Sequence, residues 1–173
     1  MAVVFRKSDE QLFDLVVGAI EQGLDQQVPW LTNIYGRCER LVKELGGKVQ
    51  ICIHTGASRL ADTIALTKGA YEAGADCAAI VTPAFICYED EELYDYFCAV
   101  AKSVPGDFPL YMYNIPPRTG NDLKPAVAER IFRDCENVLG MKASFCDLGR
   151  SLEYLSIEGM ALLQGSDVFQ LEF

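Results

Sequence analysis

The sequence predicts an α/β fold in which a parallel sheet is built from successive strand-helix units. Short apolar segments start near residues 49, 77, 109, 138 and 161, about 23 to 32 residues apart, which is the length of one such unit. These segments are almost continuously apolar, as expected for strands covered on both faces. The segments between them carry apolar residues at helical spacing. Consecutive strands are therefore expected to be parallel and joined by right-handed helical crossovers.

The N-terminal part of the chain precedes this regular pattern. Apolar residues at helical spacing follow Ser8, a suitable N-cap, and predict a helix over residues 9–22. Residues 24–35 show neither helical nor alternating periodicity and are predicted to be irregular. A second helix is predicted over residues 36–45, followed by a strand rich in β-branched residues over 48–54.

Three later helices are each indicated by one apolar face. These faces consist of Leu60, Ile64, Thr67 and Tyr71, then Leu93, Phe97, Val100 and Val104, and finally Val127, Ile131 and Cys135. No linker or break in composition interrupts the chain, so residues 1–173 are predicted to form a single domain.

Composition and charge restrict the classes of function. Half of the 173 residues are hydrophobic and 23% are charged, which is typical of a soluble globular domain. The formal charge of −10 repels phosphate backbones, and no segment approaches the roughly 20 apolar residues of a membrane span. We therefore expect no nucleic-acid partner, no membrane association and a cytoplasmic location.

The residue types that bind metals form no ligand pattern. The seven cysteines are an odd number without a C-x-x-C pair, and His54 is the only histidine. His54 ends a predicted strand, where it is either a site residue or a buried core imidazole. We expect neither a metal nor an organic cofactor, and a Ser-His-Asp mechanism is disfavoured.

A strand-helix repeat is compatible with two architectures. It can form an open doubly wound sheet or part of an eight-stranded barrel, and periodicity does not distinguish them. A complete barrel takes about 250 residues, so the barrel alternative requires an incomplete one. In both architectures the functional groups lie at the carboxyl ends of the strands and in the loops that follow.

Three residues at these strand ends suggest carbonyl chemistry. Lys142 follows Gly140 on one face of a predicted strand, and a lysine in an apolar interior is partly held as the free amine, the nucleophile of Schiff-base chemistry. Tyr113 ends the preceding strand, where a phenol can relay protons. Arg118 follows the rigid Pro116-Pro117 pair, where its guanidinium can clamp a carboxylate. The alternatives are a lysine that caps the strand end, a core tyrosine and a solvated arginine.

Short segments around these residues carry a family resemblance. They read YNIPPRTG over residues 113–120, GMKAS around Lys142, QGSD over 164–167, AYEAGAD over 70–76, and Thr82-Pro83. With them the chain resembles the dihydrodipicolinate synthase and N-acetylneuraminate lyase family of class I, pyruvate-dependent aldolases. The resemblance covers roughly residues 8–173 and implies a (β/α)₈ TIM barrel.

The resemblance also implies an activity. Lys142 and Tyr113 would be catalytic, with Lys142 forming an imine with pyruvate or another 2-oxo acid while Tyr113 shuttles protons. The reaction makes or cleaves a carbon-carbon bond with an aldehyde partner, which is the work of a lyase or aldolase. As is common in the family, we expect a homo-oligomer. Substrate binding is expected at Arg118, Thr119, Gly165 and Asp167.

The chain departs from the family pattern in several places. The first, second and eighth barrel strands are missing or poorly defined, so we predict one truncated domain, a partial TIM barrel of about five to six strand-helix units. The family's Gly-Thr-Thr-Gly-Glu loop, which holds the pyruvate carboxylate, has no counterpart in residues 24–35. Ala84-Phe85 stand where synthases often carry a tyrosine. These departures argue against a true dihydrodipicolinate synthase and leave sialic acid lyase, hydroxy-oxoglutarate aldolase and sugar-acid aldolase activities open.

Two alternatives to an enzyme stay open. One is a catalytically inactive fragment or pseudoenzyme of the same family that keeps Lys142 and acts as a binding or interaction protein. The other is an unrelated open-sheet binding protein. Labelling of Lys142 by a 2-oxo acid distinguishes an enzyme from both.

Overall fold

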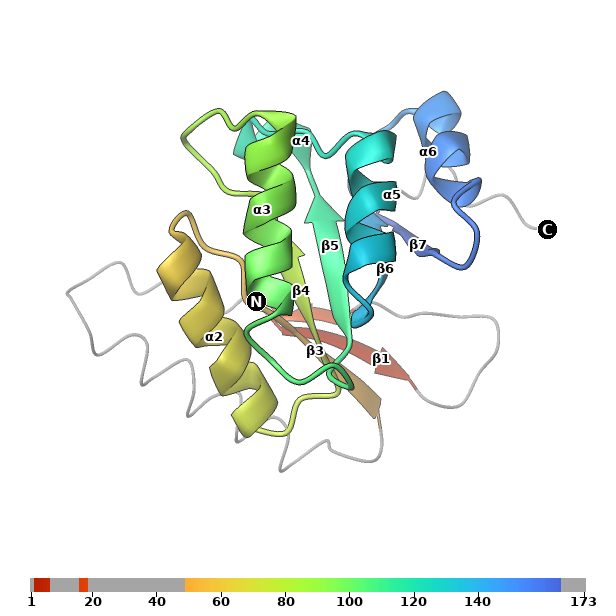
Figure 1. Cartoon of the computed structure of the whole chain (residues 1–173). Helices are drawn as coiled ribbons and strands as arrows, with labels where there is room; N and C mark the ends of the chain where they lie inside the picture. Colours follow the sequence, from red (N-terminus) through yellow and green to blue (C-terminus); the bar gives the residue numbers. More distant parts are fainter. Residues whose placement is uncertain (1, 7–15, 19–48, 166–173) are drawn as a thin grey trace.

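The computed structural model describes residues 2–6, 16–18 and 49–165, and within them the strands form one seven-stranded sheet (Figure 1). The strand order is β2-β1-β3-β4-β5-β6-β7. The strands are β1 (Ala2–Arg6), β2 (Val16–Gly18), β3 (Val49–His54), β4 (Cys77–Val81), β5 (Leu110–Asn114), β6 (Val138–Ala143) and β7 (Ala161–Gln164). The helices are α2 (Leu60–Glu72), α3 (Asp90–Ala101), α4 (Pro116–Thr119), α5 (Pro125–Asp134) and α6 (Leu148–Leu155).

The five strands β3 to β7 are parallel and lie in sequence order. A helix follows each of β3 to β6, and the five strands begin at or within one residue of the predicted positions. Parallel strands with helical crossovers form half of a (β/α)₈ barrel. This confirms the predicted partial TIM barrel.

The N-terminal strands differ from the predicted pattern. β1 runs antiparallel to both β2 and β3, whereas a barrel strand would be parallel to its neighbour. The helix predicted over residues 9–22 is wrong at Val16–Gly18, which form β2. Val16 and Val17 are β-branched and suit an extended strand better than a helix. The rest of that helix, the irregular segment 24–35 and the helix predicted over 36–45 lie outside the described residues.

The helices cover one face of the parallel sheet. α2 packs against α3, α3 against α5 and α5 against α6, and Figure 1 shows α2, α3 and α5 side by side in front of the strands. Alternate residues of each strand point toward these helices and form the main core. Large members of this core are Ile51, Ile80, Phe97, Leu110, Met112, Ile131 and Met141.

Helix boundaries follow from local chemistry. α3 begins with a capping box, in which the Glu89 side chain accepts from the backbone of Glu92 and the Glu92 side chain accepts from the backbone of Glu89. α5 begins with Pro125, whose missing N–H costs nothing in the first turn. These two helices position the loops that precede them, and both loops follow strands of the site.

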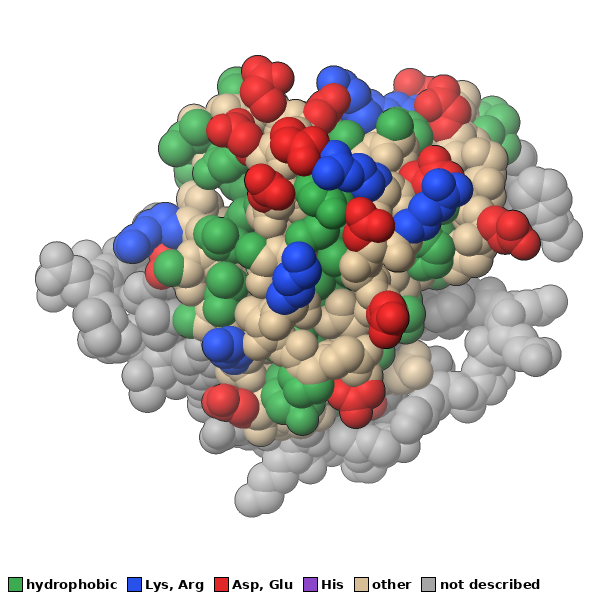
Figure 2. Space-filling model, viewed as in Figure 1, with side chains coloured by type: hydrophobic (Ala, Val, Ile, Leu, Met, Phe, Trp, Pro, Cys, Tyr) green, Lys and Arg blue, Asp and Glu red, His purple; other side chains and the backbone are tan. Residues whose placement is uncertain are grey.

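Charged side chains are interspersed over the outer face of the helices (Figure 2). Ion pairs connect α3 with the start and middle of α5, from Asp90 to Lys124 at 2.8 Å and from Glu91 to Arg130 at 2.6 Å. Their side chains are about half exposed, so each pair contributes little to the stability of the fold. No helix in the described ranges has the length and apolar character needed to cross a membrane.

Candidate active site

The face of the sheet opposite the helices carries the candidate active site. The layer of this face farther from the carboxyl ends of the strands is a small apolar cluster of Cys52, Cys77 and Ala79, against which Tyr111 and Leu163 pack. Residues two positions further along the strands point to the same face, one layer closer to the carboxyl ends. These residues include His54, Tyr113 and Lys142.

Lys142 and Tyr113 contact each other across neighbouring strands. They are register partners in the parallel β5–β6 pair, and each side chain is only 8% exposed. The Lys142 Nζ atom lies 4.4 Å from the centre of the Tyr113 ring. The ring face attracts the ammonium group, which orients the lysine in a site that water scarcely reaches. The sequence placed both residues at strand ends, and the structure brings them together.

Two glycines shape the space around Lys142. A Cβ atom on Gly165 would lie 3.3 Å from the Lys142 Cε atom and would collide with the Ser144 hydroxyl, so the absence of a side chain leaves room for the lysine. Gly140, two residues before Lys142, lies against the neighbouring strand β7. A Cβ atom there would lie 2.8 Å from Ala161 Cβ and against the Ala161 backbone, so Gly140 permits close pairing of β6 with β7.

His54 is the third residue of this layer, beside Tyr113 and Lys142. Its ring centre lies 5.9 Å from that of Tyr113, and the two ring planes are at 88°. Burial, aided by the positive charge of Lys142, lowers the pKa of His54 from 6.5 to about 4. His54 is therefore a neutral imidazole at neutral pH. The sequence left two roles open for it, a site residue or a buried core imidazole, and the structure places its ring beside the site.

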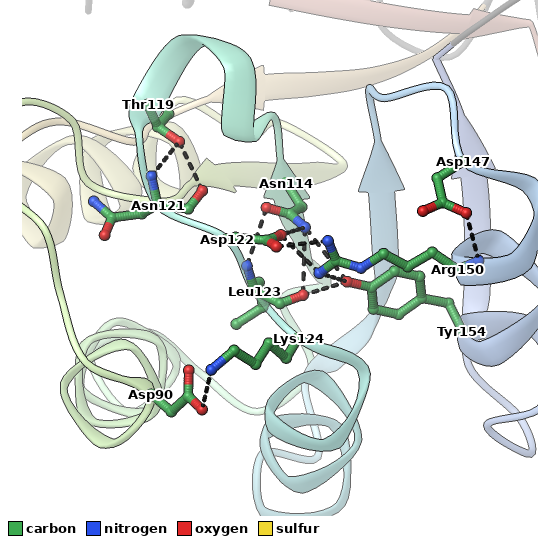
Figure 3. Close-up of polar contacts among 10 residues, drawn as sticks. All are labelled: Asp90, Asn114, Thr119, Asn121, Asp122, Leu123, Lys124, Asp147, Arg150 and Tyr154. Atoms are coloured by element: carbon green, nitrogen blue, oxygen red, sulfur yellow. Dashed lines mark hydrogen bonds and ion pairs between the residues drawn. The ribbon is translucent and has the colours of Figure 1, made fainter.

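The loop after β5 is attached to the loop after β4 by buried hydrogen bonds. The Thr82 hydroxyl donates to the Thr119 hydroxyl at 2.9 Å, and Thr119 donates to the carbonyl of Asn121 at 3.0 Å (Figure 3). The Asn121 amide donates to the carbonyls of Pro83 and Ile86. Thr119 is thus engaged in holding the two loops together, which is a structural task in addition to the substrate contact predicted for it.

A second polar network holds the same loop to α6. Arg150 donates to both carboxylate oxygens of Asp122, at 2.5 and 2.7 Å, and the Asn114 amide donates to Asp122 at 3.0 Å (Figure 3). The Tyr154 hydroxyl donates to the carbonyl of Leu123. Burial alone would raise the pKa of Asp122, but the hydrogen bonds from Arg150 and Asn114 outweigh it and hold that pKa below its ordinary value.

This network was missed at the sequence level. Asn114 belongs to the YNIPPRTG segment, which indicated a functional loop but did not indicate which residues of α6 would hold that loop. Arg150 and Tyr154 lie one turn apart on α6, and nothing in their spacing distinguishes them from ordinary helix residues. The network fixes the loop that begins directly after Tyr113, so these residues support the site without lining it.

The remaining predicted site residues have different surroundings. Arg118 lies on the short helix α4, is exposed, and forms no ion pair with any residue in the described part of the chain. Its guanidinium is therefore available to a ligand from solvent. Gly165 is described, whereas Asp167 lies outside the described residues. Among residues 2–6, 16–18 and 49–165, no cluster of three His, Cys, Asp or Glu side chains has a geometry that could hold a metal.

Comparison with known proteins identifies the family. The sequence model of the dihydrodipicolinate synthetase family matches residues 36–173. The chain belongs to the dihydrodipicolinate synthetase family. This confirms the resemblance seen in the sequence and places the chain in a family of pyruvate-dependent aldolases and lyases.

Individual members of the family match in sequence and structure. The 4-hydroxy-tetrahydrodipicolinate synthase of Thermus thermophilus is 42% identical over 118 residues, which are 68% of this chain and 38% of the relative. The crystal structure of dihydrodipicolinate synthase from Aquifex aeolicus matches with a TM-score of 0.75 and 30% identity, covering 79% of this chain and 46% of that one. The enzyme from Acinetobacter baumannii, complexed with pyruvate, matches with a TM-score of 0.73 and 31% identity, covering 78% and 46%. This family member thus spans less than half the length of each of the three.

Proposed function

We propose that this family member is a lyase or aldolase in which Lys142 forms a Schiff base with pyruvate or another 2-oxo acid. The observation that supports this most directly is the buried Lys142 amine, 4.4 Å from the ring centre of Tyr113 at the carboxyl ends of β5 and β6. The uncharged form of the amine is the nucleophile that attacks a carbonyl carbon. We assign the proton transfers to Tyr113, because its ring contacts this amine.

The proposed reaction begins with proton transfer and addition. The uncharged Lys142 amine adds to the keto carbon of the 2-oxo acid, and one proton passes from the nitrogen to the former carbonyl oxygen to give a neutral carbinolamine. Tyr113 carries a proton to the hydroxyl group, which leaves as water, and the nitrogen lone pair forms the C=N bond of an iminium ion. The iminium accepts the electron pair released when the neighbouring carbon loses a proton or a carbon-carbon bond breaks. The resulting enamine adds to an aldehyde in the synthetic direction.

Substrate binding follows from the same arrangement. The guanidinium of Arg118 binds the carboxylate of the 2-oxo acid. Gly165, where a Cβ atom would collide with the Ser144 hydroxyl, lets the backbone lie close to the Lys142 Cε atom. Asp167 and the Thr119 hydroxyl complete the proposed set of binding groups. The Acinetobacter relative complexed with pyruvate supports the choice of 2-oxo acid. We also propose a cytoplasmic location and a homo-oligomeric state. Among the described residues β7 pairs with β6 alone, and a second copy could pair with its other edge.

Borohydride trapping tests the proposal. The purified chain is incubated with pyruvate and reduced, so that an imine becomes a stable secondary amine, and the modified peptide is located by mass spectrometry. We expect one adduct on Lys142, no adduct in Lys142→Met, and slower adduct formation in Tyr113→Phe. Lys102→Met is the matched control, because Lys102 is an exposed lysine at the end of α3 and should not affect trapping.

Two results would contradict the proposal. A chain that is folded by circular dichroism and gives no adduct would be the catalytically inactive family member described above. Adducts spread over exposed lysines, and unaffected by Lys142→Met, would mean that the chemistry is nonspecific.

A further inference from the structure

We infer that His54 is a positioning residue of this site, whose ring holds the Tyr113 ring in the orientation in which it faces Lys142. The inference rests on the proposed function, because it assigns His54 to the same reactive pair. It also makes a structural claim about Tyr113 and Lys142 that can be tested without any reaction.

The three residues lie on three strands of the sheet. His54 ends β3, Tyr113 is the fourth residue of β5, and Lys142 is the fifth residue of β6. Between β3 and β5 lies β4, whose residues on this face are the small Ala79 and the half-buried Val81. Because these β4 side chains are short, the larger rings on either side meet across them.

The contact between the two rings has a defined geometry. Their centres are 5.9 Å apart and their planes are nearly perpendicular, at 88°. Edge-to-face pairs at this distance are attractive and favour one ring orientation over others. The Lys142 Nζ atom lies over the same Tyr113 ring, so rotation of this ring would remove both contacts. The three groups therefore form a chain of contacts in which His54 acts on Lys142 through Tyr113.

The charge state of His54 agrees with this role. Burial lowers the pKa of His54 to about 4, so the ring is neutral at physiological pH and does not repel the Lys142 ammonium group. A neutral imidazole also supplies no positive charge to a substrate carboxylate. The ring contact, rather than a charge, is therefore the contribution of His54.

The test compares two substitutions that differ in whether they keep a ring. His54→Leu fills most of the space without an aromatic ring, whereas His54→Phe retains an aromatic edge for Tyr113. Cys52→Ala is the control for loss of packing in the same strand, because Cys52 points to the same face one layer below and is 2% exposed. Urea unfolding of each variant shows how much of any effect is a loss of stability.

The first measurement is independent of activity. In the full chain labelled with ¹³C-lysine, the Lys142 Cε carbon is bonded to the Nζ atom that lies over the Tyr113 ring, so we expect its protons upfield of those of exposed lysines. The signal is assigned by its loss in Lys142→Met. We expect His54→Leu to move this signal toward the exposed lysines, while His54→Phe and Cys52→Ala leave it in place. An unchanged signal in His54→Leu would overturn the inference.

The second measurement is the rate of borohydride trapping with pyruvate. Misplacement of a reacting group by about 1 Å costs up to about 100-fold in rate, so we expect His54→Leu to slow trapping by at least about tenfold and His54→Phe by less than about threefold. If His54→Phe traps pyruvate as slowly as His54→Leu does, the positioning role of the ring is overturned in favour of a hydrogen bond from the imidazole. Absence of any adduct in the unsubstituted chain would contradict the proposed function, and the lysine signal would then decide the inference by itself.

Discussion

The close pairing of β6 and β7 at Gly140 predicts a large effect from a single added methyl group. In Gly140→Ala, the new Cβ atom would lie 2.8 Å from Ala161 Cβ and 2.9 Å from its carbonyl carbon. Real Cβ atoms essentially never show contacts below 3.0 Å, and ordinary contacts begin at 3.4 Å. Both obstructing groups belong to the neighbouring strand, so β7 itself has to move by at least about half an ångström.

The magnitude follows from packing and from the strand ladder. Overpacking of this kind costs typically about 1–3 kcal/mol. The Gly140–Ala161 register pair is the first of the β6–β7 ladder, and loss of one hydrogen bond there adds about 1 kcal/mol. We therefore expect Gly140→Ala to lower the free energy of unfolding by about 2–4 kcal/mol. Because Lys142 is two residues further along the same strand, pyruvate trapping should slow as well.

Urea unfolding measures this effect against a matched control. A Cβ atom on Gly106 would meet nothing within 4 Å, and Gly106 has no positive φ. Gly106→Ala should therefore change stability by less than about 1 kcal/mol, in the stabilising direction because alanine restricts the unfolded chain. Equal effects of the two substitutions would refute the reasoning, since backbone entropy would then outweigh the contact with Ala161.

Two further predictions concern the Tyr154 network and the titration of His54. Tyr154→Phe removes a buried hydroxyl whose partners keep other hydrogen bonds, so it should lower the free energy of unfolding in urea by about 1–2 kcal/mol. Tyr94→Phe loses only a surface hydrogen bond and should cost less. Equal costs would mean that the buried network adds nothing to stability. Burial, aided by the charge of Lys142, holds the pKa of His54 at about 4 in the folded chain against 6.5 in the unfolded one. As pH falls below 6.5, the unfolded chain binds a proton at His54 before the folded chain does, so the free energy of unfolding falls. This loss is absent above pH 6.5 and reaches roughly 3 kcal/mol at pH 4. Between pH 7 and 4 the free energy of unfolding of His54→Phe should fall by that much less than that of the unsubstituted chain. Parallel curves of unfolding free energy against pH for the two proteins would refute the lowered pKa of His54.

The parallel half of the fold could be predicted because its signals are local. Each strand is a short apolar segment between two helical patterns, and both signals lie within a few residues. The N-terminal segment shows where this fails. The apolar residues of this segment recur at helical spacing although Val16 and Val17 favour a strand, and the pairing of β2 with β1 decides between the two.

The site could be predicted in part for the same reason. Lys142 and Tyr113 end two consecutive strands, so parallel topology alone brings them to one edge of the sheet. The His54 contact depends on the small size of the β4 side chains between the rings, and the role of Gly140 depends on which backbone lies beside it. Such facts about register and neighbouring volume involve several segments at once, and no single stretch of sequence contains them.

The sequential order of β3 to β7 also bears on how the molecule is made. Each of the strands β4 to β7 pairs with the one synthesised immediately before it, so a nascent chain can add these strands to the sheet in the order in which they leave the ribosome. The contact between Tyr113 and Lys142 needs only β5, β6 and the crossover between them. The reactive pair can thus form before β7 has been translated, whereas the space that Gly165 leaves beside the lysine is completed last.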